Sequence, residues 1–328
     1  MKQLDLLEGV RVLEVGRFVA VPFAGRLLAD LGATVERVSE ADADPDARRL
    51  PPGAVRSLDD FLSRGKARVS PALLAERARD ADLVLADIRA LPADFAPQST
   101  LISILRMGAD GAAPLADSAL LCARAGVSWA IGEPGRPPLA MPAHSADHLV
   151  GAVFAGASLA LLLAGAEGRH EIDALVALSA FVEQNSTSYR ESGIGWRREG
   201  RRAPGSAGIY PYGLLPCADG QIVMLGRSTR DWQAISDGIG AHDVFERFPD
   251  PFEIAREHAD EVDALLAPYL ARLSKADVLS LAETTGVLAA PVAEIDEVAA
   301  RDHLATERDF WHDIDGVRVP GLPFVVHD

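Results

Sequence analysis

The stretch VRVLEVGRFVAVPFAGRLLADLGATVERV, residues 10–38, decides the fold class of this chain of 328 residues. Residues 10–15 are rich in valine and leucine, which indicates a short strand. Pro22 suits the first turn of a helix, and apolar residues then recur at helical spacing until Gly32, a typical C-terminal stop. Residues 34–38 predict a second strand. A strand–helix–strand unit of this length joins parallel strands by a right-handed crossover, so the chain begins as an α/β protein.

The next segments continue this alternation of strand and helix. Residues 71–80 predict a helix, and residues 83–87 and 101–105 predict two more strands. Residues 41–60 are polar and rich in proline, which is typical of a loop. We therefore predict an open α/β sheet in the N-terminal part of the chain.

The C-terminal part predicts a second and smaller unit. Residues 210–216 and 221–225 flank Ala-Asp-Gly, which indicates a β-hairpin. Helical patterns follow at 232–238 and across 252–285, and residues 291–295 predict a strand.

The composition excludes several classes of function. Lys and Arg number 32 and Asp and Glu 48, so the net charge is 32 − 48 = −16, which argues against nucleic acid and anionic membranes as partners. The two cysteines, Cys122 and Cys217, cannot build a disulfide framework. The N-terminus shows no signal segment, so we expect a reduced, cytoplasmic protein.

Residues 149–166 carry no charge and are long enough for a membrane span. Their many alanines and glycines make the segment small rather than strongly hydrophobic. We therefore predict a buried core helix that is apolar all round, followed by another helix over residues 172–189.

Known nucleotide and metal motifs are missing. The turn after the first strand contains one glycine, Gly16, which does not match a dinucleotide fingerprint, and no P-loop occurs. His144 and His148 flank Asp147 at a spacing of four residues, but no third ligand accompanies them, so we predict no metal. Asp147 precedes the uncharged helix, where it could be an N-cap or a carboxylate nucleophile; the residue pattern alone favours the N-cap.

Seven segments together carry a family resemblance. They are LEGVRVLEVGRFVAVPFAGRLLADLGATVERV (7–38), SRGKARV (63–69), RMGADGAAP (106–114), HSADHLVGAVFAGASLALLLA (144–164), GRHEIDALVALSA (168–180), APGSAGIYPYGLLPCADGQIVMLGRSTRDW (203–232) and TTGVLAAPVAEIDEV (284–298). These segments resemble the class III CoA-transferases, the carnitine dehydratase/bile-acid-inducible family, which includes formyl-CoA transferase and alpha-methylacyl-CoA racemase. The resemblance covers nearly the whole chain and keeps the order of the family's segments.

The resemblance implies a Rossmann-like large domain with an inserted small α+β domain, in an interlocked homodimer. We accordingly expect the first part of the large CoA-binding domain over residues 1–195 and a linker over 196–208. The small domain then spans 209–285, and residues 286–328 return to the large domain. The interface of such a dimer would bury the apolar helix.

The resemblance also implies a CoA-transferase that moves CoA between an acyl-CoA thioester and a small carboxylic acid. Asp147 matches the family's nucleophile and would form an aspartyl-acyl anhydride, with backbone N–H groups at the helix start holding the oxyanion. Acyl-CoA is then a substrate, and no covalently bound cofactor is expected. The residues expected to bind CoA are Val15, Gly16, Arg17, Ala20, Arg37, Lys66 and Arg89.

The chain departs from the family at several motifs. The family's Asn-x-Arg-Pro-Gly turn is degraded at residues 88–91, and its Tyr-Asp-x-x-x-Gln segment reads differently at 117–122. The racemase histidine near residue 117 or 118 is missing, as is the racemase glutamate at 228–229. We therefore prefer a transferase and retain two alternatives, a 2-methylacyl-CoA racemase and a catalytically weak CoA-binding family member. The acyl donor and acceptor cannot be named from the sequence.

Overall fold

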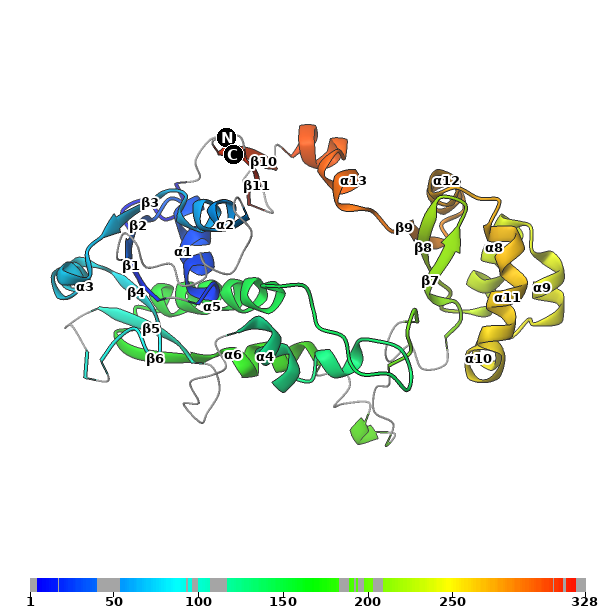
Figure 1. Ribbon diagram of the computed structural model, residues 1–328, viewed down its shortest axis with the longest axis horizontal. Helices are drawn as coiled ribbons and strands as arrows, with labels where there is room; N and C mark the ends of the chain where they lie inside the picture. Colours follow the sequence, from blue (N-terminus) through cyan, green and yellow to red (C-terminus); the bar gives the residue numbers. More distant parts are fainter. Residues whose placement is uncertain are drawn as a thin grey trace. The chain divides into compact units, whose positions relative to one another are not determined.

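The structure is a computed structural model, and it divides into two compact units (Figure 1). It describes residues 5–16, 18–39, 54–92, 94–95, 100–106, 117–182, 189–191, 193, 198–202, 209–308, 310–314 and 317–322. Unit 1 consists of Met1–Ser128, Ala140–Glu183 and Ala300–Asp328, and unit 2 of Trp129–Leu139 and Gln184–Ala299.

Unit 1 is built on a six-stranded parallel sheet with the strand order β3-β2-β1-β4-β5-β6. The central strands β4 and β5 are buried almost along their whole length, as expected for a sheet covered on both faces. The strands are β1 (Arg11–Val15), β2 (Thr34–Val38), β3 (Lys66–Val69), β4 (Leu83–Asp87), β5 (Leu101–Arg106) and β6 (Gly168–Asp173). The predicted α/β class with a parallel first pair is confirmed.

The strand order reverses direction beside β1. The chain runs outward through β2 and β3, and β4 then pairs with the other side of β1. Ligands of open α/β sheets bind beyond the carboxyl ends of the strands at such a reversal. Gly16 follows β1 at this edge, where a Cβ would lie 2.9 Å from Oδ2 of Asp87, the last residue of β4. The two strand ends are therefore close-packed.

Six α-helices, two short 3-10 turns and one π-helical turn accompany the sheet in the described part of unit 1. They are α1 (Ala20–Asp30), α2 (Ala54–Ser63), η1 (Pro71–Leu73) leading into α3 (Leu74–Asp80), α4 (Ser118–Arg124), α5 (Ser145–Leu163), α6 (Ala174–Ser179) followed by η4 (Ala180–Val182), and η6 (His303–Glu307). Two predictions were wrong here. Helix α2 occupies part of the segment 41–60 predicted as a loop, and β6 takes the start of the helix predicted over 172–189, because pairing with β5 outweighs the local pattern.

Helix α5 is packed against α1 along one face (Figure 1). A Cβ on Gly151 would lie 2.6 Å from the carbonyl oxygen of Ala20, so only glycine permits this approach. On the opposite face Leu149, Val153 and Leu163 are 36%, 42% and 86% exposed. The helix is long and apolar enough to cross a membrane by length and composition, and 39% of its most apolar window is buried. The predicted burial all round is therefore wrong for the single chain.

Unit 2 contains a three-stranded antiparallel sheet, in the order β7-β8-β9, and a helical layer. The predicted hairpin is confirmed, and the buried Trp232 lies in the core between sheet and helices. The elements are β7 (Tyr212–Cys217), β8 (Gly220–Leu225), α8 (Thr229–Ile239), α9 (His242–Arg247), α10 (Pro251–Glu253), η5 (Ile254–His258), α11 (Ala259–Leu270), α12 (Lys275–Thr285), β9 (Leu288–Pro291) and α13 (Ile295–Ala299).

The strand β9 corrects two sequence expectations. It ends at Pro291, where the predicted strand 291–295 was to begin, and α13 begins at Ile295. It also pairs with β8, so the chain has not left unit 2 at residue 286, where the return to the large domain was placed. Strand pairing across more than sixty residues of sequence sets this boundary, and local composition does not reveal it.

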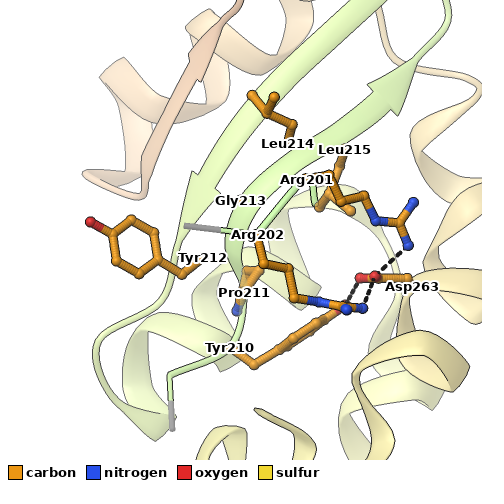
Figure 2. Close-up of a pocket in the computed structure, with 9 residues that line it drawn as sticks. All are labelled: Arg201, Arg202, Tyr210, Pro211, Tyr212, Gly213, Leu214, Leu215 and Asp263. Carbon is orange, nitrogen blue, oxygen red and sulfur yellow. Dashed lines mark hydrogen bonds and ion pairs between the residues drawn. The ribbon is translucent and has the colours of Figure 1, made fainter. Parts of the chain in front are cut away.

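A buried carboxylate, Asp263 of α11, organises the start of unit 2 (Figure 2). The guanidinium groups of Arg201 and Arg202 each lie 2.5 Å from its Oδ2, and the hydroxyl of Tyr210 donates to its Oδ1 at 2.8 Å. Burial and the charge of Asp263 hold the pKa of Tyr210 well above its ordinary value. The described part of the predicted linker, residues 198–202, is thus tied to unit 2 and is not a solvated spacer.

Replacing Asp263 with asparagine should destabilise unit 2, because both guanidinium groups lose their buried charge partner. Hydrogen bonds to charged groups contribute about 1.5–3 kcal/mol each, so the urea midpoint should fall clearly. Asp260→Asn is the matched control, since Asp260 also pairs with Arg202 but its side chain is 91% exposed. Equal unfolding midpoints for the two variants would contradict a structural role for Asp263.

Candidate functional site

Asp147 lies in the first turn of α5 and is 4% exposed. The helix begins after His144, so Asp147 is its third residue and not the N-cap favoured by the sequence pattern alone. Its Oδ2 lies 3.1 Å from Nδ1 of His144. The carboxyl group is therefore withdrawn from bulk solvent, and among the described residues the imidazole of His144 is the side chain that bonds to it.

The environment of Asp147 disfavours its charged form. Burial raises the pKa of this carboxyl, and the nearby Asp117 adds to the rise, whereas His144 and His148 oppose it. The result is a pKa above the ordinary aspartate value. A carboxylate that has lost its water shell in this way is a stronger nucleophile than one in solution.

Helix α4 supplies the wall beside Asp147. The hydroxyl of Ser118 accepts a hydrogen bond from the backbone N–H of Ala146 at 3.0 Å. Cys122, one turn further along α4, is buried, and burial together with the charge of Asp147 raises the pKa of its thiol. The segment 117–122, which reads as a departure from the family in sequence, thus packs directly against the candidate nucleophile.

The start of α5 has fewer free donors than the sequence suggested. The N–H of Ser145 donates to the carbonyl of Pro142 at 3.2 Å, and the N–H of Ala146 donates to Ser118. Both groups are therefore engaged. These two N–H groups are therefore not free to hold an oxyanion, as the family resemblance implied for the helix start.

Three of the residues expected to bind CoA lie at the carboxyl end of β1. Val15 ends the strand, Gly16 follows it, and Ala20 begins α1. Ala20 contacts Gly151, which lies one helical turn after Asp147. The structure therefore brings this edge of the sheet close to the first turn of α5. Arg17 lies outside the described residues.

Lys66 and Arg37 lie in a buried ionic cluster around Glu14. Both Lys66 and Glu14 have fully buried side chains and form an ion pair, and Lys66 also donates to the carbonyl of Pro22 at 2.7 Å. Arg37 approaches the other oxygen of Glu14 at 3.1 Å and Asp59 at 3.1 Å. Burial lowers the pKa of Lys66, and Glu14 opposes that change.

This cluster bears on the expected CoA contacts. A phosphate could reach the Lys66 ammonium only if the ion pair opened, so its role in CoA binding stays a prediction that the geometry does not favour. The sequence analysis did not predict a role for Glu14. A glutamate inside the apolar run at residues 10–15 was nevertheless a signal that a buried cation must face it.

Arg89 differs from the other two described cations. It follows β4 at the same edge of the sheet, its side chain is exposed, and its backbone N–H donates to Oδ1 of Asp87 at 3.0 Å. Its guanidinium is accessible to an anionic ligand. Among the residues that the structure describes, no three His, Cys, Asp or Glu side chains are grouped so as to hold a metal ion.

Fold and site together define an α/β protein with a buried carboxyl group beside the carboxyl edge of a parallel sheet. The family model for CoA-transferase family III matches residues 7–86 and 106–328. The chain belongs to this family.

Named relatives agree with this assignment. A succinate–glutarate CoA-transferase of Agrobacterium fabrum is 28% identical, over 96% of this chain and 88% of its own length. A succinyl-CoA–D-citramalate CoA-transferase of Chloroflexus aurantiacus is 27% identical, over 96% of this chain and 84% of its own length. These names support CoA transfer as the activity at the level of the family.

Solved structures show the same fold. A CAIB/BAIF family protein from Brucella suis superposes with a TM-score of 0.81 at 21% identity, covering 100% of this chain and 94% of its own. A hypothetical protein from Mycobacterium tuberculosis has a TM-score of 0.79 at 23% identity, covering 98% and 93%. At this identity the likeness concerns the fold alone.

Replacing Lys66 with methionine should lower the free energy of unfolding, because Glu14 would remain buried with one cation fewer beside it. Removing one member of a buried ion pair costs about 3–5 kcal/mol. The double variant Glu14→Gln, Lys66→Met should recover part of this loss in chemical denaturation, since it removes both charges. A single variant as stable as the parent would show that Lys66 is not structural.

Proposed function

We propose that this protein is an acyl-CoA:carboxylate CoA-transferase and that Asp147 carries the acyl group as a mixed anhydride. The observation that carries the proposal is the 4% exposure of Asp147 at the start of α5, in a chain that belongs to CoA-transferase family III. Burial supplies the dry carboxylate that attack on a thioester requires.

The proposed reaction has four steps, and in each step one bond forms as another breaks. A carboxylate oxygen of Asp147 attacks the thioester carbon, the carbon–sulfur bond breaks, and CoA leaves as a thiolate. The thiolate then attacks the Asp147 carbonyl carbon of the anhydride and releases the donor acid as a carboxylate. The acceptor carboxylate displaces the thiolate from Asp147, and the thiolate finally attacks the acceptor's acyl carbon and frees Asp147.

Exclusion of water is the requirement that the site must meet. An anhydride on Asp147 is hydrolysed wherever water reaches it, which would convert a transferase into a thioesterase. The low exposure of Asp147 and the packing of Ser118 and Cys122 beside it support transfer over hydrolysis.

The CoA moiety would bind at the carboxyl edge of the sheet. We propose a Rossmann-like large domain, since the order β3-β2-β1-β4-β5-β6 is that of the doubly wound nucleotide-binding sheets. Val15, Gly16 and Ala20 would line this edge, and the exposed Arg89 would meet a phosphate. Arg17 is proposed from the family resemblance alone.

The relatives narrow the choice of test substrates. Their names give succinate, glutarate and D-citramalate as CoA donors or acceptors. We propose that the acids used by this protein are small carboxylic acids of this kind, and that succinyl-CoA with glutarate is the first pair to assay.

No observation favours the racemase alternative. Ser228, at the position of the racemase glutamate, caps α8 by accepting from the N–H of Asp231 at 3.1 Å. Asp117 caps α4, and Ser118 accepts from Ala146. These side chains have structural roles at the positions where a racemase would need acid and base groups.

We also propose a homodimer, in the interlocked form implied by the family resemblance. The exposed apolar face of α5, with Leu149, Val153 and Leu163, supports an interface. Sedimentation should report a dimer at micromolar concentration. Val153→Glu should shift it towards monomer, whereas Leu279→Glu, a similarly exposed residue of unit 2, should not. A parent protein that sediments as a monomer would contradict the proposal.

Asp147→Asn should abolish transfer from succinyl-CoA to glutarate without lowering thermal stability, because the isosteric amide cannot form the anhydride. In the parent protein the rate should fall on acidification at a higher pH than for an ordinary aspartate, since burial raises the pKa of Asp147 and only the ionised form attacks. Asp296→Asn, an exposed residue of unit 2, is the control. Undiminished transfer by the Asp147→Asn variant would exclude this mechanism. So would the absence, by mass spectrometry, of an acyl or CoA adduct on Asp147 of the parent protein.

A further inference from the structure

His144 has the only positive φ angle among the non-glycine residues that the structure describes, at 63°. Left-handed backbone is disfavoured for any residue with a Cβ, and such outliers persist where the surroundings impose them, often at functional sites. His144 also makes no side-chain capping bond to the helix that it precedes. A side-chain cap of α5 therefore does not account for the left-handed backbone of His144.

The strained backbone aims the imidazole at the candidate nucleophile. Nδ1 of His144 lies 3.1 Å from Oδ2 of Asp147. The carbonyl of the same residue accepts twice from His148, from its backbone N–H at 3.0 Å and its Nδ1–H at 2.7 Å. The ring of His148 is in turn fixed edge-on against Phe23, with ring centroids 4.6 Å apart. His144 is thus held in place from both sides.

The imidazole spans the boundary between the buried carboxyl and solvent. The side chain of His144 is 30% exposed, whereas that of Asp147 is 6% exposed. Among the described residues, four titratable groups face Asp147: His144 just before α5, His148 on α5, Asp117 just before α4, and Cys122 on α4. Within the described residues, His144 is the one in hydrogen-bond contact with the carboxyl.

We infer that His144 is a positioning residue for Asp147, whose Nδ1–H holds Oδ2 and keeps the carboxylate ionised while Oδ1 attacks the acyl carbon. This inference rests on the proposed function. Burial pushes the carboxyl towards its neutral form, and a hydrogen bond donated to the charged form pulls it back.

The same contact serves the release of the acyl group. In the last step the CoA thiolate attacks the acyl carbon of the second anhydride, and the bond between that carbon and the Asp147 oxygen breaks. The electron pair returns to the Asp147 carboxylate, and the Nδ1–H stabilises that charge. The proton stays on Nδ1 throughout, so no acid or base is consumed. At each step one carbonyl carbon, that of the acyl group or that of Asp147, exchanges one bond to sulfur or oxygen for another.

Two substitutions separate the donor from the backbone strain. Glycine and asparagine both tolerate the left-handed conformation, but only asparagine has an N–H that can reach a neighbouring carboxylate. With succinyl-CoA and glutarate, His144→Gly should lower kcat about a hundredfold, the scale for loss of one preorganised donor, with little change in KM for succinyl-CoA. Its acid limb should move to higher pH, and His144→Asn should restore most of kcat. His242→Asn in unit 2 is the control for histidine replacement.

A direct titration separates this inference from the proposed function. In protein labelled with carboxyl-13C aspartate, the resonance missing from Asp147→Asn identifies Asp147. Its titration midpoint should be higher in His144→Gly than in the parent, whether or not any transfer occurs. A parent without transfer would overturn the proposed function alone. An unchanged midpoint, an unchanged kcat in His144→Gly, or no rescue by asparagine would overturn the role of His144.

Discussion

The close contact of α5 with α1 at Gly151 is the constraint on which the site depends. No side chain fits between this helix and the Ala20 carbonyl, so the two helix starts are locked side by side. Asp147 lies one turn before Gly151, and Ala20 follows the loop after β1. The contact therefore fixes the candidate nucleophile beside the carboxyl edge of the sheet, where nucleotide-bearing ligands of such folds bind.

Two of the buried carboxylates, Glu14 of β1 and Asp147 of α5, differ in how their charge is compensated. Glu14 is fully buried and meets both Lys66 and Arg37, so its charge is compensated inside the fold. Asp147 is nearly as buried, but among the described residues its carboxyl group bonds to the imidazole of His144, and its pKa is raised. Full compensation stabilises a structure, whereas partial compensation leaves a carboxylate reactive. The difference explains why Asp147, and not Glu14, is the candidate nucleophile.

An overall charge of −16 is compatible with an anionic ligand because recognition is local. At the sheet edge the exposed Arg89 supplies positive charge, while Lys66 and Arg37 are engaged with Glu14. In unit 2 the arginine pair Arg201 and Arg202 is likewise engaged, with Asp263. Counting cations along the sequence therefore overestimates the number that a phosphate could meet.

The residue pattern was enough to predict the parallel α/β start over residues 10–38 and the hairpin of β7 and β8, and the family resemblance selected Asp147 as the candidate nucleophile. These features rest on local periodicity, turn residues and a family motif, all of which are legible within a few tens of residues. Three further features become visible in the folded chain: Lys66 meets Glu14, 52 positions away, β9 pairs with β8, and His144 turns its ring onto Asp147. Those outcomes depend on which distant groups share a buried space, and burial makes unpaired charges and unpaired strand edges too costly to leave.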